Sequence, residues 1–296
     1  MKAYLLGILG VVIFAITFPM TRLAVGTLEA PQLSPWFSAL GRAAVAGILS
    51  LFYLAYIAMR ADKTNPNKKF WPSKDDWLPL ALTALCIVFG FPILTTWALR
   101  YVEAIHASVL YGFLPLMTAA IGAYMARQRP SIGFWFCAAL GSVLVIAYAV
   151  IRNDSTWIIH PADFLLFAAM LFAAYGYAKG AKVTAHLGAE RVICWALVIS
   201  LPITLPIAFA LWPSQDISTA SWFGFAYIAV FSMWLGFFAW YRALALGGTV
   251  RISQIQLIQP FLSMAASVPI LGERLDLLTV GFALLVITTV FIGKKL

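Results

Sequence analysis

Polar side chains that could bind a small solute lie inside two long apolar runs of this sequence. In the run near 252–271, five polar residues follow one another at spacings of three or four, which keeps them on one face of a helix. They are Ser253, Gln256, Gln259, Ser263 and Ser267. In the run near 105–125, Ser108 and Tyr111 begin a similar stripe. Because polar groups that face lipid are costly, we expect both stripes to line an internal path. Ordinary hydrogen bonding between helices is the alternative.

One cation, Arg42, also lies well inside an apolar run. It is about seven residues from the end of the run, or roughly 10 Å deep at 1.5 Å per residue. Its guanidinium fork suits a substrate carboxylate. The alternative is that it pairs with backbone carbonyls or extends its head group toward the membrane surface.

Aromatic and proline residues add to this set of candidates. Four aromatic side chains near the polar faces could stack on a planar substrate. They are Trp97, Tyr111, Tyr175 and Trp240. Pro115 and Pro260 each remove one backbone hydrogen bond from a predicted helix, so each is a candidate hinge, with a static kink as the alternative.

Other kinds of chemistry find little support. All eleven carboxylates lie in loops or at the ends of apolar runs, and the three histidines form no metal-binding set. A G-x-x-x-x-G-K-[ST] phosphate-binding loop is absent. Cys86, Cys137 and Cys194 fall in apolar runs and are expected to be small buried side chains. We therefore expect no enzyme, no cofactor and no metal. The lack of a mid-membrane carboxylate argues against proton coupling.

The elements that must position these residues are membrane-spanning helices. Apolar residues make up 63% of the chain and charged residues 10%, against about 25% charged residues in soluble domains. A span needs about 20 apolar residues, and only helices satisfy their own backbone groups in lipid. Ten apolar runs occur, near 4–21, 35–59, 77–99, 105–125, 132–151, 164–178, 192–212, 222–240, 252–271 and 277–292.

Charge in the loops predicts the orientation. With ten spans, one set of alternate loops and ends carries fifteen Lys and Arg residues, and the other set carries four. The basic side is expected in the cytoplasm, which places both termini there and the chain in the inner (plasma) membrane. The net charge of +9 is thus a signal of topology, and we expect a lipid bilayer and no nucleic acid as partner.

An internal repeat organises the ten predicted spans. One offset of 145 residues matches the segment from Ala98 to Pro115 with the segment from Ala243 to Pro260, pairing Ser108 with Ser253. Each half holds five spans, an odd number, so the second half must enter the membrane from the opposite side. We expect an all-α membrane protein whose repeats, 1–151 and 160–294, surround a central cavity. Such inverted repeats are typical of transporters.

These segments resemble a known family. Ala98–Pro115 and Ala243–Pro260, together with the Leu271-Gly272-Glu273-Arg274-Leu275 ending, resemble the paired signatures of the drug/metabolite transporter superfamily, EamA type. The first half departs from the pattern, with Ala126-Arg127-Gln128 in place of the usual Gly-Glu, so any role of Glu273 is not duplicated. The resemblance implies export of amino acids, including aromatic ones, or of related metabolites.

We therefore expect an alternating-access carrier that exports a small metabolite, with an amino acid as the leading cargo. It would act as a monomer or a weak homodimer. A nucleotide-sugar or organophosphate exchanger is one alternative, but it would require several cations in the cavity. A membrane scaffold that transports nothing is the other alternative.

Overall fold

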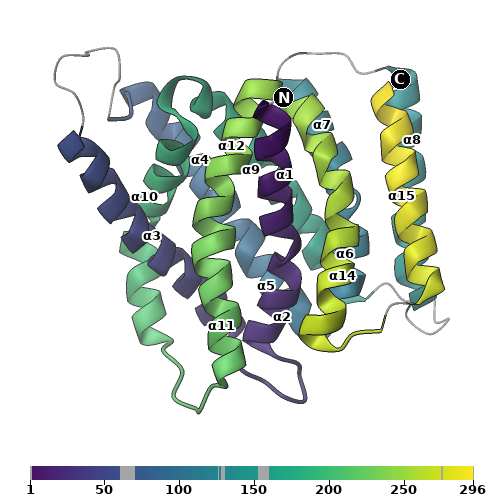
Figure 1. Ribbon diagram of the computed structural model, residues 1–296, viewed down its shortest axis with the longest axis horizontal. Coiled ribbons are helices and arrows are strands. Elements are labelled where there is room, and N and C mark those ends of the chain that lie inside the picture. Colours follow the sequence, from purple (N-terminus) through teal and green to yellow (C-terminus); the bar gives the residue numbers. More distant parts are fainter. Residues whose placement is uncertain are drawn as a thin grey trace.

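The computed structural model describes residues 2–60, 71–125, 127, 131–152, 160–274 and 276–295. Within these residues every regular element is a helix, and one isolated bridge joins Gly26 and Pro31. The helices run roughly side by side, and both ends of the chain lie at the same end of the bundle (Figure 1). We call this the termini end and the opposite one the distal end.

The first half of the chain forms five helical stretches, several of them divided. In chain order they are α1 (Lys2–Ala15) with α2 (Thr17–Val25); α3 (Pro35–Arg60); η1 (Lys74–Asp76), α4 (Trp77–Ala84), η2 (Leu85–Gly90) and α5 (Phe91–Tyr101); α6 (Ala104–Tyr111) with α7 (Leu114–Met125); and α8 (Ile132–Arg152).

The second half repeats this division. Its stretches are α9 (Pro161–Leu187); α10 (Ala189–Ala210); α11 (Thr219–Tyr227), η3 (Ile228–Leu235) and α12 (Gly236–Gly247); α13 (Thr249–Ser253), η4 (Gln254–Ile258) and α14 (Gln259–Leu271); and α15 (Leu277–Lys295).

Eight of these stretches are long and apolar enough to cross a membrane, counting only the described residues. The other two, α8 and α15, are helices that pair with each other at one edge of the bundle (Figure 1). The chain is thus an all-helical membrane protein, while the count of ten spans stays a prediction. The sixth run was predicted too short, because α9 extends well beyond 164–178. Polar side chains in its last turns find partners, described below, and the helix is capped by Gly188.

Irregular turns occur at matching places in the two halves. The fourth stretch breaks at Gly112 and Phe113, just before Pro115, and the ninth narrows to a 3₁₀ segment just before Pro260. Each proline lies in the first turn of the helix that follows, where it costs no intrahelical bond. The third and eighth stretches both contain π-helical turns, at 85–90 and 228–235. The offset of 145 residues found in the sequence relates these irregularities as well.

Helices of one half pack mainly on helices of the other. The helix α6 contacts α14, α7 contacts α13, α5 contacts α9, and α1 contacts α12. One large buried cluster runs through these contacts and joins both halves. The polar stripes of the fourth and ninth stretches therefore meet inside the protein.

Candidate functional site

The two predicted polar stripes meet at two serines. The Ser108 hydroxyl on α6 lies 2.6 Å from the Ser263 hydroxyl on α14, and both side chains are buried. The offset of 145 residues relates Ser108 to Ser253 and Thr118 to Ser263. The counterpart of the Ser108–Ser263 contact would therefore be a contact between Ser253 and Thr118. Ser253 instead donates to the Val250 carbonyl at 3.1 Å, and the buried Thr118 hydroxyl has no partner among the described residues. A side-chain hydrogen bond therefore joins the two stripes in the distal half of the seam, and the matching bond between Ser253 and Thr118 is not formed in the other half.

Arg42 is the largest polar side chain in this interior. It is 1% exposed, and of the described residues it is the one buried Lys or Arg. Two of its guanidinium nitrogens, Nε and Nη1, have no hydrogen-bond partner within the described part of the chain. The burial of the side chain argues against the alternative in which it extends toward the membrane surface. An unpaired buried cation is costly, so its environment suits an anionic group of a ligand.

Other buried polar atoms near the seam also lack partners among the described residues. Gln256 has neither its amide oxygen nor its nitrogen satisfied, and the Gln259 oxygen and the Trp240 indole nitrogen are also unpaired. Buried polar groups in proteins are normally hydrogen-bonded, so a group of such orphans requires a cause. Together they offer donors and acceptors to a polar solute.

Aromatic rings surround these groups. Tyr111 packs edge-on against Phe18, with ring centroids 4.5 Å apart, and its hydroxyl lies 3.4 Å from that of Thr95. Tyr177, on α9, lies beside Gln256 and packs on Trp240 at 5.6 Å. Tyr177 was not among the predicted residues, because in the sequence it is one more aromatic residue in an apolar run.

Two predicted aromatic residues lie away from this group. Trp97 is half-buried and packs edge-on against Trp36, which is 44% exposed. Tyr175 is half-buried beneath the Lys179 ammonium, which lies 5.9 Å from the ring centroid. The structure thus gathers Arg42, Tyr111 and the ninth-stretch residues in the interior, and it leaves Trp97 and Tyr175 nearer the periphery.

A cavity of about 660 Å³ with charged residues in its lining opens at the distal end. Its lining includes both cations and carboxylates, chiefly Arg22, Glu103, Glu273 and Arg274. Burial raises the pKa of Glu273 above its ordinary value, and this effect exceeds that of the two backbone N–H groups that bind the carboxylate.

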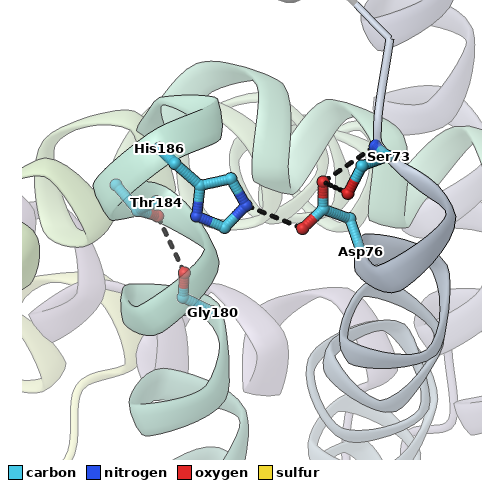
Figure 2. Close-up of polar contacts among 5 residues, drawn as sticks. All are labelled: Ser73, Asp76, Gly180, Thr184 and His186. Carbon is cyan, nitrogen blue, oxygen red and sulfur yellow. Dashed lines mark hydrogen bonds and ion pairs between the residues drawn. The ribbon is translucent and has the colours of Figure 1, made fainter.

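Each end of α9 is joined to the first half by a pair of His and Asp side chains. Near the distal end, His106 Nε2 lies 2.7 Å from Asp163 Oδ1, and both side chains are nearly inaccessible. At the termini end, His186 Nε2 lies 2.7 Å from Asp76 Oδ1, and the other oxygen of Asp76 accepts from the backbone and hydroxyl of Ser73 (Figure 2). The sequence placed Asp163 and His106 at helix ends, correctly, but gave no sign that they meet.

The three cysteines are free and buried. No group of three or more His, Cys, Asp or Glu side chains that could hold a metal ion occurs among the described residues.

Known proteins share this architecture. The EamA-like transporter family matches residues 1–150 and 160–292. The uncharacterized transporter YdeK of Bacillus subtilis (strain 168) is 37% identical over 291 residues, covering 98% of this chain and 96% of its own. The uncharacterized transporter YyaM of the same organism is 26% identical, covering 92% and 86%. A solved crystal structure with a TM-score of 0.65 and 13% identity, covering 98% and 97%, shows the shared fold. This chain therefore belongs to the EamA-like transporter family, a family of multi-pass membrane proteins.

Proposed function

We propose that this protein is a secondary transporter that exports a small metabolite, with an amino acid as cargo and aromatic amino acids as the first to test. The single observation that carries the proposal is that Arg42, Gln256 and Gln259 are buried and carry side-chain polar atoms with no hydrogen-bond partner among the described residues. Ionisable residues inside a membrane protein typically face the interior or a water-filled cavity and mark substrate pathways.

The chemistry of these groups fits an amino acid. The guanidinium nitrogens of Arg42 can donate to a carboxylate, and the amide oxygens of Gln256 and Gln259 can accept from an ammonium group. The rings of Tyr111 and Tyr177 offer flat apolar faces to a side chain.

The transport mechanism in this proposal is alternating access by two inverted five-helix repeats. The matched helix breaks and the matched packing of α6 on α14 and α7 on α13 support such a repeat. The excess of Lys and Arg in alternate loops supports cytoplasmic termini in an inner (plasma) membrane, so the distal end would face outward. We expect a monomer or a weak homodimer and no enzymatic activity.

Exchange of nucleotide sugars or organophosphates is less well supported, because such doubly charged cargo would require several buried cations and the described residues provide Arg42 alone. A scaffold that transports nothing would give no reason for so many unpaired polar atoms in its interior.

The test is uptake of labelled phenylalanine or tryptophan into proteoliposomes. We expect Arg42→Ala and Gln256→Ala each to reduce uptake strongly. Arg60→Ala, which removes an exposed arginine stacked on Tyr56, serves as the control and should leave uptake unchanged. If both site variants transport like the parent protein, the site assignment is wrong. If the parent protein transports no amino acid, the proposed substrate class is wrong.

A further inference from the structure

The short junction between α5 and α6 is held by two side chains that come from distant parts of the sequence. Arg22, on α2, donates through Nη1 to the backbone carbonyls of Leu99 and Val102, with a distance of 2.8 Å to the latter. Glu273, just after α14, accepts from the backbone N–H groups of Ala104 and Ile105, each at 2.9 Å.

These bonds satisfy groups that a helix cannot satisfy by itself. The last carbonyls of α5 and the first N–H groups of α6 have no partner within their own helices. The residue before α6, Glu103, provides no side-chain cap. Because Ala104 and Ile105 are fully buried, loss of the Glu273 carboxylate would leave two N–H groups without water or protein partners. The position of α6 therefore depends on Arg22 and Glu273.

The junction also lies where a path to the interior would open. Arg22 and Glu273 line the distal cavity of about 660 Å³. On the inner side of the junction, one turn further along α6, Ser108 meets Ser263. If α6 moved away from α14, the cavity would extend to the seam, and both Glu273 bonds would have to break.

We propose that Arg22 and Glu273 are positioning residues that hold the distal gate of the transporter closed by clamping the α5–α6 junction. This rests on the proposed alternating-access function.

The experiment measures access to the seam and requires no transported solute. Ser263→Cys is introduced into a protein whose Cys86, Cys137 and Cys194 are replaced by alanine, and a membrane-impermeant maleimide is added outside intact cells. Slow labelling is expected in this parent, because residue 263 is 1% exposed. Glu273→Ala should accelerate labelling about tenfold, the scale of two lost hydrogen bonds, and Glu273→Gln should fall between, since it keeps one acceptor. Glu29→Ala, which removes an exposed carboxylate from the neighbouring α2–α3 loop, should change nothing.

A purely structural cap would behave differently. Its loss would lower the unfolding temperature of Glu273→Ala but leave the labelling rate at the parent value, which would overturn the proposal. Should Glu273→Ala fail to fold, Arg22→Ala gives a second test, because it removes the Nη1 group that donates to both junction carbonyls. It should also accelerate labelling, and an unchanged rate would overturn the proposal equally. Faster labelling of Glu273→Ala, together with a parent protein that transports no amino acid, would support the gate and contradict only the proposed cargo.

Discussion

The two pairs of His and Asp side chains at the ends of α9 allow burial to be tested as the cause of stability. Both have the same Nε2–Oδ1 distance of 2.7 Å, but the His106 side chain is 4% exposed and that of His186 is 58% exposed. Removing one partner from a buried pair leaves a polar group that neither water nor protein satisfies, at a cost of about 3–5 kcal/mol. In the other pair only His186 is exposed, but Asp76 keeps its two bonds from Ser73 when the histidine is lost, so this pair should contribute about 1 kcal/mol or less.

We therefore expect His106→Leu to destabilise the protein by about 3 kcal/mol, toward the lower end of that range. Asp163 keeps one other bond, from the His160 backbone N–H at 3.1 Å. At about 2 °C per kcal/mol for a chain of this size, the unfolding temperature should fall by about 6 °C. His186→Leu should lower it by about 2 °C at most.

The assay is thermal unfolding of purified protein in detergent, followed by tryptophan fluorescence at a fixed heating rate. A double-mutant cycle with Asp163→Asn adds a second reading, since the amide can still accept from His160 while it no longer carries a charge. The double variant should be more stable than the sum of the single effects predicts. Equal shifts for His106→Leu and His186→Leu would refute the reasoning, because the two histidines differ strongly in exposure while their aspartates are both buried.

Three further predictions follow from single contacts. Gly180→Ala should lower the unfolding temperature, since the added Cβ would lie 2.4 Å from the fully buried ring of Tyr241, whereas Gly281→Ala, with nothing within 4 Å, should not. Ser108→Ala should cost about 1 kcal/mol in the same assay. Because burial raises the pKa of Glu273, its protonation adds stability, which is fully present below its ordinary pKa and is lost as pH rises through the raised value. The unfolding temperature of the parent should therefore rise relative to Glu273→Gln between pH 7 and pH 4.5, and parallel curves would contradict this.

Much of the helical layout could be predicted from the sequence, because lipid imposes length and apolarity on every span. The break before Pro115 and its match before Pro260 follow from the missing N–H of proline, which cannot continue the hydrogen bonding of the turn before it. The interior position of Arg42 was also predicted, since its distance from the end of an apolar run can be counted directly in the sequence.

Contacts between distant residues could not be predicted in this way. Arg22 reaches carbonyls 77 and 80 residues away, and Glu273 caps a helix 169 residues away. One local signal was present: Ser73 and Asp76 form the S-x-x-D pattern of a helix cap, which explains why that carboxylate is held in place. The partner His186 could not be inferred from that pattern, because pairing across the bundle depends on packing.

The fastening of α9 at both ends has a consequence for how the protein is made. A ribosome delivers α6 to the membrane before α9, so His106 must wait for Asp163, which follows 57 residues later. Asp76 waits longer still, for His186, 110 residues behind it. The first five stretches therefore cannot complete these two polar contacts until α9 has been made. The helix that begins the second half thus supplies the partners of both pairs, and helices made after it, such as α12 and α14, still have to pack on α1 and α6.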